Sequence, residues 1–345
     1  MPLLDMVKNL DALFEGASLE PRRPPRFPGV AIDIDPGRIT GVRVEPDRKD
    51  GALRLCAVES RSLPEGAIEP SLVRPNVRVL EPVALALRAI LPKVATGEPR
   101  VSLLLPDHVA RVALLAFATF PRTRRELVAL VRFRMAKSLP FKPDEAVLDL
   151  MLPGGAPAPG TAAAGGNVLA VFMHRAVVEQ YEALLSASGY WPGLVGLSTF
   201  ELYNLFRGRL EPQPGDAKDT LFLNVTGQYL SLLLFRGEEL IFYRCKPHAA
   251  EAGEGGGPAG IRREIYTSLA FYQEKLLGRG IGRAYLRVCG LPRDEVLAAA
   301  AVEVGCPIEP LDLLQVLPVA APLALDAENA SLAAPAAGAI VGRRS

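Results

Sequence analysis

The sequence is poor in the side chains that most often carry chemistry. Its 345 residues include four cysteines and three histidines, namely Cys56, Cys245, Cys289, Cys306, His108, His174 and His248. The cysteines are far apart, without a C-x-x-C pair or a histidine cluster. This spacing argues against a metal site or a disulfide framework and favours small buried thiols in a reducing compartment. No serine or cysteine has a paired base at a recognisable spacing, so a nucleophilic triad is not indicated and the histidines fit structural roles.

The sequence also lacks an excess of one charge and a long apolar run. The net charge is +1, which gives no field for attracting a nucleic acid. The longest clean apolar run, residues 112–120, is well short of the roughly 18 to 20 residues that cross a bilayer. The N-terminus has no basic stretch followed by an apolar core, so it is not typical of a signal peptide. We therefore expect a soluble, cytoplasmic protein.

Apolar residues make up 49% of a chain whose length suits two domains. Residues 30–35 (VAIDID) alternate as a strand, end at a Pro36-Gly37 turn and are followed by strands at 39–45 and 53–60. Strands predicted at 221–225, 229–235 and 240–243 repeat this pattern later in the chain. Helical sequence follows each meander, so an internally duplicated α/β fold is predicted.

A capped helix is predicted between the two meanders. Thr123 stands three residues before Glu126, which is the spacing of a capping box. Pro140 ends the helix, because the residue before a proline avoids the α region. The apolar side chains of one helical face are Leu127, Val128, Val131 and Met135. Further helices are predicted at 83–95, 176–188, 200–206, 261–277 and 293–304, and further strands at 101–105, 167–172 and 284–289.

Several segments are predicted to be irregular. Residues 153–166 are rich in Gly, Ala and Pro and are expected to form a mobile loop. Residues 252–260 are expected to form a glycine-rich loop, and the C-terminus a tail interrupted by prolines. Asp144, Glu145 and Asp149 are expected in a solvated loop that leads into an edge strand.

Residues 3–14 have the apolar spacing of an amphipathic helix, and a Pro/Arg linker at 21–28 follows them. Two interpretations stay open. The helix is either a docking element for a partner or membrane surface, or a segment that folds back on its own domain or frays.

Residues 105–149, LPDHVARVALLAFATFPRTRRELVALVRFRMAKSLPFKPDEAVLD, resemble a segment of PilM, the actin-like family of type IV pilus assembly. GYWPGLVGLSTFELYNLF at 189–206 and AAGAIVGRR near the C-terminus are also similar, so the resemblance covers residues 30–342. It implies an α/β, duplicated actin-like (ribonuclease H-like) fold whose two halves face a nucleotide cleft. The expected division is an N-terminal extension at 1–29, a first half at 30–200 with a small inserted α/β subdomain at about 101–172, and a second half at 201–345.

The resemblance also implies where a nucleotide would bind. The family's phosphate and adenosine turns correspond to Asp33, Gly37, Arg38, Asn224, Thr226, Gly227 and Gly290. Such turns bind phosphate through backbone N–H groups, small residues and a hydroxyl, and hold Mg²⁺ through acidic residues. This chain instead has Asp35, Pro36 and Arg38 in the first turn and Asn224 in the second. We expect a degenerate cleft with no catalytic residue and no hydrolysis, while residual binding of ATP with Mg²⁺ stays open.

The partner implied by the resemblance is the N-terminal cytoplasmic peptide of a PilN-like membrane protein, alongside other pilus assembly proteins. Membrane association would then be indirect, at the inner membrane. The expected peptide contacts lie on the inserted subdomain, at Leu127, Val131, Arg134, Leu139 and Phe141. Three alternatives stay open. GspL-like and FtsA-like proteins share the fold but should carry a membrane-spanning or membrane-binding helix, and a small-molecule kinase would need an Asp where Asn224 stands.

Overall fold

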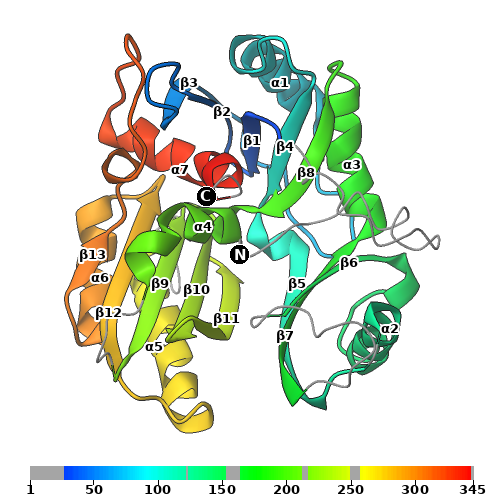
Figure 1. Ribbon diagram of the computed structural model, residues 1–345, viewed down its shortest axis with the longest axis vertical. Helices are drawn as coiled ribbons and strands as arrows, with labels where there is room; N and C mark the ends of the chain where they lie inside the picture. Colours follow the sequence, from blue (N-terminus) through cyan, green and yellow to red (C-terminus); the bar gives the residue numbers. More distant parts are fainter. Residues whose placement is uncertain (1–26, 122, 153–163, 212–216, 249–256, 343–345) are drawn as a thin grey trace.

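The computed structural model describes residues 27–121, 123–152, 164–211, 217–248 and 257–342 (Figure 1). Within these residues the strands form two five-stranded sheets and one three-stranded sheet. The predicted helix at 3–14, most of its linker and most of the predicted loop at 153–166 lie outside the described residues. Among the described residues, no helix combines the length and apolar composition needed to span a bilayer.

The two five-stranded sheets share one topology. The first has the order β3-β2-β1-β4-β8 and the second the order β11-β10-β9-β12-β13. In each, three antiparallel strands form a meander, and two further strands add in parallel beside its first strand. The predicted duplicated actin-like fold is therefore confirmed. The strands are β1 (Val30–Asp35), β2 (Arg38–Pro46), β3 (Leu53–Ser62), β4 (Arg100–Leu105), β8 (Trp191–Leu197), β9 (Asp219–Thr226), β10 (Tyr229–Arg236), β11 (Glu239–Pro247), β12 (Ile281–Cys289) and β13 (Ile308–Pro310).

Helices cover both sheets, so the central strands are buried on both faces. Every residue of β9 is buried, and β1 is buried up to Asp35, as expected for strands between two helical layers. Contacts join α1 to β2 and β3, α3 to β8, α5 to β10 and β11, and α6 to β12 and β13. These helices are α1 (Leu80–Val94), α3 (Arg175–Ser186), α5 (Gly257–Lys275) and α6 (Arg293–Val304).

The third sheet and one helix form a small subdomain. Its strands are β5 (Ala110–Thr119), β7 (Ala164–His174) and β6 (Ala146–Met151), antiparallel and in that spatial order. The helix α2 (Arg124–Met135) packs on one face. Its capping box is confirmed, because the Glu126 N–H donates to Thr123 Oγ1 at 3.2 Å and the Thr123 N–H donates to Glu126 Oε2 at 3.3 Å.

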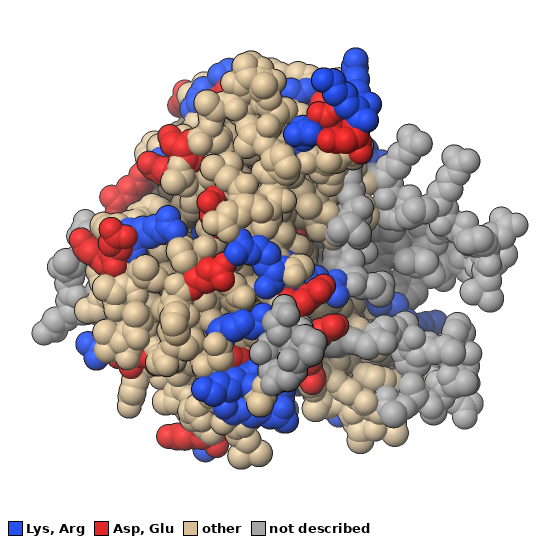
Figure 2. Space-filling model, turned by 60° about the vertical axis from the view of Figure 1, so that its left-hand side comes forward, with Lys and Arg blue, Asp and Glu red and all other residues tan. Residues whose placement is uncertain are grey.

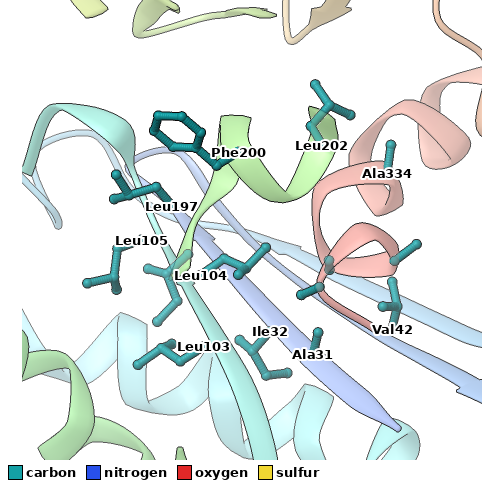
Figure 3. Packing of buried hydrophobic residues seen from close by; sticks show 14 of the residues in the cluster. Ala31, Ile32, Val42, Leu103, Leu104, Leu105, Leu197, Phe200, Leu202 and Ala334 are labelled. Carbon is teal, nitrogen blue, oxygen red and sulfur yellow. The ribbon is translucent and has the colours of Figure 1, made fainter. Parts of the chain in front are cut away.

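Two helices lie between the large sheets, α4 (Ser198–Leu210) and α7 (Ala327–Val341) (Figure 1). They pack against each other, and α7 also contacts β1, β2, β4 and β12. Figure 3 shows Phe200 of α4 and Ala334 of α7 beside the first sheet, in the same buried cluster as Leu104. The prediction of a proline-punctuated tail was therefore wrong from residue 327 onward. Pro335 is buried inside α7, and small alanines rather than a periodic apolar face build this helix.

Two predicted loops also end earlier than expected. Residues 164–166 belong to β7, where glycine is required because a β carbon at Gly165 would lie 1.8 Å from the Phe117 carbonyl oxygen. Residues 257–260 form the first turn of α5, and Pro258 suits the start of a helix.

Asp149 is not solvated as predicted, because it lies on β6 with 5% of its surface exposed. Burial raises the pKa of Asp149 to about 7, although the Leu150 N–H donates to it and Arg124 lies 3.5 Å away.

Candidate nucleotide cleft and partner surface

Asp33, near the end of β1, lies in the interior, with 8% of its surface exposed. Ser198 Oγ, at the start of α4, lies 2.6 Å from Asp33 Oδ1 and 3.1 Å from the Leu105 carbonyl oxygen. Burial raises the pKa of Asp33 to about 7, and the hydrogen bond from Ser198 opposes this shift only in part. The first predicted turn therefore starts from a carboxyl group that is already engaged by α4.

The turn after Asp33 uses its own groups internally. The Gly37 N–H donates to Asp35 Oδ1 at 3.2 Å, so the predicted phosphate donor is bonded to the carboxylate that replaces the family's glycine. Removal of water around Asp35 raises the pKa of this carboxyl group to about 6. Arg38 stands opposite Asp35 in the register of the β1–β2 hairpin. Its Nη1 donates to Ser60 Oγ at 3.3 Å.

The second predicted turn is also occupied by internal bonds. Asn224 is fully buried, and its Nδ2 donates to Thr199 Oγ1 at 2.6 Å while its Oδ1 accepts from Arg287 Nη1 at 2.8 Å. Thr226 Oγ1 accepts from the N–H groups of Gln228 and Tyr229, at 3.2 and 3.1 Å. The amide and the hydroxyl that the family resemblance assigned to a nucleotide thus hold the protein's own turn.

Gly227 and Gly290 are brought together by the fold. A β carbon at Gly227 would lie 3.4 Å from the Gly290 carbonyl oxygen, and Gly290 has a φ of +72°, which favours glycine. Gly290 also lines a cavity of about 410 Å³, bounded by the end of β12, the residues after β13 and the start of α7. Of the predicted nucleotide ligands, Gly290 alone lines this cavity, whose polar walls include Arg293, Asp312 and Glu328.

A buried polar network that sequence inspection missed joins the two large sheets. Asp107, two residues after the end of β4, accepts the Thr199 N–H at 3.0 Å on Oδ1 and the Ser231 hydroxyl on Oδ2. Burial raises the pKa of Asp107. Thr199 then connects to Asn224, and Asn224 to Arg287. The signal available in the sequence was an arginine in the middle of an apolar strand, at Arg287.

Several groups of the two predicted turns are engaged within the protein itself. Phosphate binding by such turns needs free backbone N–H groups and a free hydroxyl. The Gly37 N–H donates to Asp35, the Thr226 hydroxyl donates to the Tyr229 carbonyl oxygen at 3.4 Å, and Asn224 brings no charge to a metal. A nucleotide would have to displace these hydrogen bonds and approach the carboxyl groups of Asp33 and Asp35.

The expected peptide contacts divide by burial. Leu127, Val131 and Leu139 are at most 8% exposed and pack in the core of the small subdomain, beneath α2. The Arg134 guanidinium is at the surface, 4.1 Å from the centre of the Phe117 ring, and its Nη1 donates to the Ala116 carbonyl oxygen at 2.6 Å. Phe141 is half-buried, with its ring edge-on to that of His174.

Phe133 is a large exposed apolar side chain on the described part of the small subdomain, and it was not among the expected contacts. It lies on α2 beside Arg134, with 79% of its surface exposed. Of the expected peptide contacts, Arg134 and Phe141 thus reach the surface, and the exposed Phe133 lies next to Arg134 in the sequence.

Two duplicated sheets with α4 and α7 between them and a small three-stranded insertion are the architecture of the actin-like fold. No protein-family model matches the chain, and no curated protein matches its sequence. Among solved structures, it is similar to a chain of the PilM-PilN type IV pilus biogenesis complex. The identity is 18% and the TM-score 0.72, over 92% of this chain and 98% of that chain. The expected resemblance to PilM is thus confirmed at the level of the fold.

Two further solved structures are more distant. The cytoplasmic domain of EpsL, from the type II secretion system of Vibrio cholerae, is 8% identical, with a TM-score of 0.46 over 90% of this chain and 94% of that chain. A protein of unknown function with an actin-like ATPase fold, from Bacteroides thetaiotaomicron, is 10% identical, with a TM-score of 0.44 over 82% and 90%. Similarity at this level carries no argument about function.

Proposed function

We propose that this chain is a cytoplasmic scaffold of a type IV pilus, or related secretion, inner-membrane complex. It binds the N-terminal cytoplasmic peptide of a PilN-like membrane protein and does not hydrolyse ATP. The observation that carries the proposal is the similarity to the chain of the PilM-PilN complex, which extends over 92% of this chain and 98% of that one. Membrane association is then indirect, through the peptide and its transmembrane segment.

The proposed peptide site lies on the small subdomain. Phe133 and Arg134 are exposed on α2, and Phe141 is half-buried after it, so an aromatic ring and a cation are available at this surface. Aromatic and arginine side chains are the residues that most often dominate binding energy at interfaces. Leu127, Val131 and Leu139 contribute by holding α2 on the sheet, since their side chains are buried there. Moderate affinity suffices, because tethering of both partners at one membrane raises the effective concentration.

Loss of hydrolysis is supported by the internal bonding of both turns. The Gly37 N–H already donates to Asp35, the Thr226 hydroxyl to the Tyr229 carbonyl oxygen and the Asn224 amide to Thr199. The proposal therefore assigns the chain no catalytic residue. Mixed acidic and basic side chains on the face in Figure 2 fit a protein that recognises its partners locally rather than through a strong overall field.

The test is a titration of the full chain with a fluorescent peptide that copies the cytoplasmic N-terminus of the PilN-like protein of the same organism. We expect saturable binding, weakened about fivefold to tenfold by Arg134→Glu. Arg263→Glu, an equal charge reversal at an exposed position of α5, is the matched control and should bind like the parent. Absence of binding by the parent, or equal loss in both variants, contradicts the proposal.

A further inference from the structure

The positive charge of the chain is concentrated in the small subdomain. Residues 110–174 contain eight lysines and arginines and four acidic residues, a net charge of +4 in a chain whose total is +1. The rest of the chain therefore has a net charge of −3. Five of the eight cations lie on α2 or within two residues of its end, namely Arg124, Arg125, Arg132, Arg134 and Lys137. Such a separation of charge favours one orientation of the molecule toward an anionic surface.

Two of these cations are used inside the subdomain. Arg124 lies 3.5 Å from the Asp149 carboxylate. Arg132 is half-buried, and its guanidinium donates to the carbonyl oxygens of Pro143 and Ala146 at the start of β6. Both residues therefore help to hold α2 on the sheet, and the charge that α2 offers to a partner comes from the other cations.

The outward face of α2 is a stripe of exposed side chains spaced four residues apart. Arg125, Ala129 and Phe133 form it, and the exposed Lys137 follows two residues after the end of the helix. Side chains four apart lie one above the other along a helix, so this stripe is opposite the apolar face that packs on the sheet. Phe133 is 79% exposed. Neither Arg125 nor Lys137 has an ion pair with another residue that the structure describes.

An exposed aromatic ring between unpaired cations suits the surface of an anionic bilayer. The cations stay beside the headgroup phosphates, while the ring enters the boundary between headgroups and acyl chains. The negative charge on the rest of the chain supports this assignment, because an extended anionic plane attracts the subdomain and repels the other parts. A duplex nucleic acid would attract the same cations, but it offers no apolar layer for Phe133.

We propose that α2 docks the chain directly on an anionic bilayer through Arg125, Phe133 and Lys137. The inference rests on the proposed function for the presence of a bilayer, because a peptide next to a transmembrane segment keeps its receptor close to the membrane. The surface residues Arg134 and Phe141 of the proposed peptide site belong to the same subdomain. The lipid contact therefore adds to the indirect association through the PilN-like protein and orients the subdomain toward the membrane.

The experiment is flotation of the full chain, without peptide, with vesicles of phosphatidylcholine alone or mixed with phosphatidylglycerol. The parent should bind the mixed vesicles and not the neutral ones, and added salt should weaken the binding. Arg125→Glu combined with Lys137→Glu should lower the partition coefficient about tenfold to thirtyfold. Arg263→Glu combined with Lys275→Glu, an equal charge change at exposed positions of α5, is the matched control and should bind like the parent.

A second variant separates the apolar contact from the charge. Phe133→Ser should weaken vesicle binding about fivefold and leave its salt dependence as in the parent, because salt does not screen the transfer of an apolar ring. Equal binding of the parent to neutral and mixed vesicles, an equal loss in both charge-reversal variants, or equally tight binding to duplex DNA would overturn the inference.

Binding of the soluble peptide distinguishes this inference from the proposed function. The protein with Arg125→Glu and Lys137→Glu should bind the fluorescent peptide like the parent, since neither residue belongs to the proposed peptide site. A parent that binds the peptide but no anionic vesicle would overturn the lipid contact and leave the proposed function intact. A parent that binds anionic vesicles but no peptide would support the lipid contact and contradict the proposed function.

Discussion

Gly338 of α7 lies directly against the backbone of Glu201 in α4. A β carbon at Gly338 would stand 1.9 Å from the Glu201 carbonyl oxygen and 2.6 Å from its carbonyl carbon. Since α7 also contacts β1, β2 and β4, this backbone-to-backbone crossing fixes the C-terminal helix against the first sheet. The two helices between the sheets therefore depend on a position that only glycine can occupy without a shift.

Gly338→Ala should destabilise the fold by about 1 to 3 kcal/mol or more, because the added methyl group must push two helix backbones apart. Gly208→Ala in α4 is the matched control. A methyl group added at Gly208 would meet no heavy atom within 4 Å, so alanine there should stabilise the helix by roughly 0.5 to 1 kcal/mol. Urea unfolding of both variants measures the difference, and similar effects at the two sites would contradict the proposed crossing.

Glu201 should make stability fall as pH rises. Burial raises the pKa of Glu201 to about 8, above its unfolded value, although Asn204 Nδ2 donates to it at 3.0 Å. Between about pH 4.5 and pH 8, Glu201 is therefore protonated in the folded state and ionised in the unfolded state. The free energy of unfolding falls as pH rises through this window. Glu201→Gln should flatten this slope, in unfolding free energies measured from pH 5 to pH 8. A slope equal to that of the parent would contradict the assignment.

The cap of α2 should contribute measurably to the stability of the small subdomain. Thr123→Ala removes the hydroxyl that accepts the Glu126 N–H, at an expected cost of about 1 kcal/mol. Thr123→Ser keeps that hydroxyl and should recover most of the loss. Denaturant unfolding of the three proteins tests this, and a Ser variant no more stable than the Ala variant would argue against the cap.

Mg-ATP at millimolar concentration should leave the unfolding temperature unchanged and release no phosphate. A ligand at about one hundred times its Kd would stabilise the fold by roughly 2.7 kcal/mol, so binding of useful strength would be visible. A clear upward shift would show that the turns exchange their internal bonds for phosphate. ATP turnover stimulated by a sugar or a carboxylic acid would favour the small-molecule kinase alternative.

Local patterns were enough to predict most of the fold. Both meanders, the capping box at Thr123 and the helix over Arg293–Val304 follow from short-range alternation, caps and turns, and the structure contains all of them. The helix α7 was not predicted, because its small alanines pack against α4 and the first sheet rather than forming a periodic apolar face. Pro335 within the helix also argued against a helix in the sequence. Tertiary packing rather than propensity forms that helix.

The site was harder to predict because its partners are distant in the chain. The Ser231 hydroxyl and Asp107 are separated by 124 positions, and the Thr199 N–H and Asp107 by 92. Periodicity identified Leu127 and Val131 as one apolar face, but it does not say what covers that face, and here the sheet of the subdomain covers it. Likewise, the sequence showed that Asn224 replaces an acid, but not that Arg287 bonds to it.

Co-purification of the full chain with the intact PilN-like membrane protein of the same organism, in detergent, tests the scaffold proposal most directly. The two proteins should purify together, and deletion of the cytoplasmic residues before the transmembrane segment of the PilN-like protein should abolish the association. The complex should form equally with EDTA and with Mg-ATP. Failure to associate, or association that survives the deletion, would contradict the account.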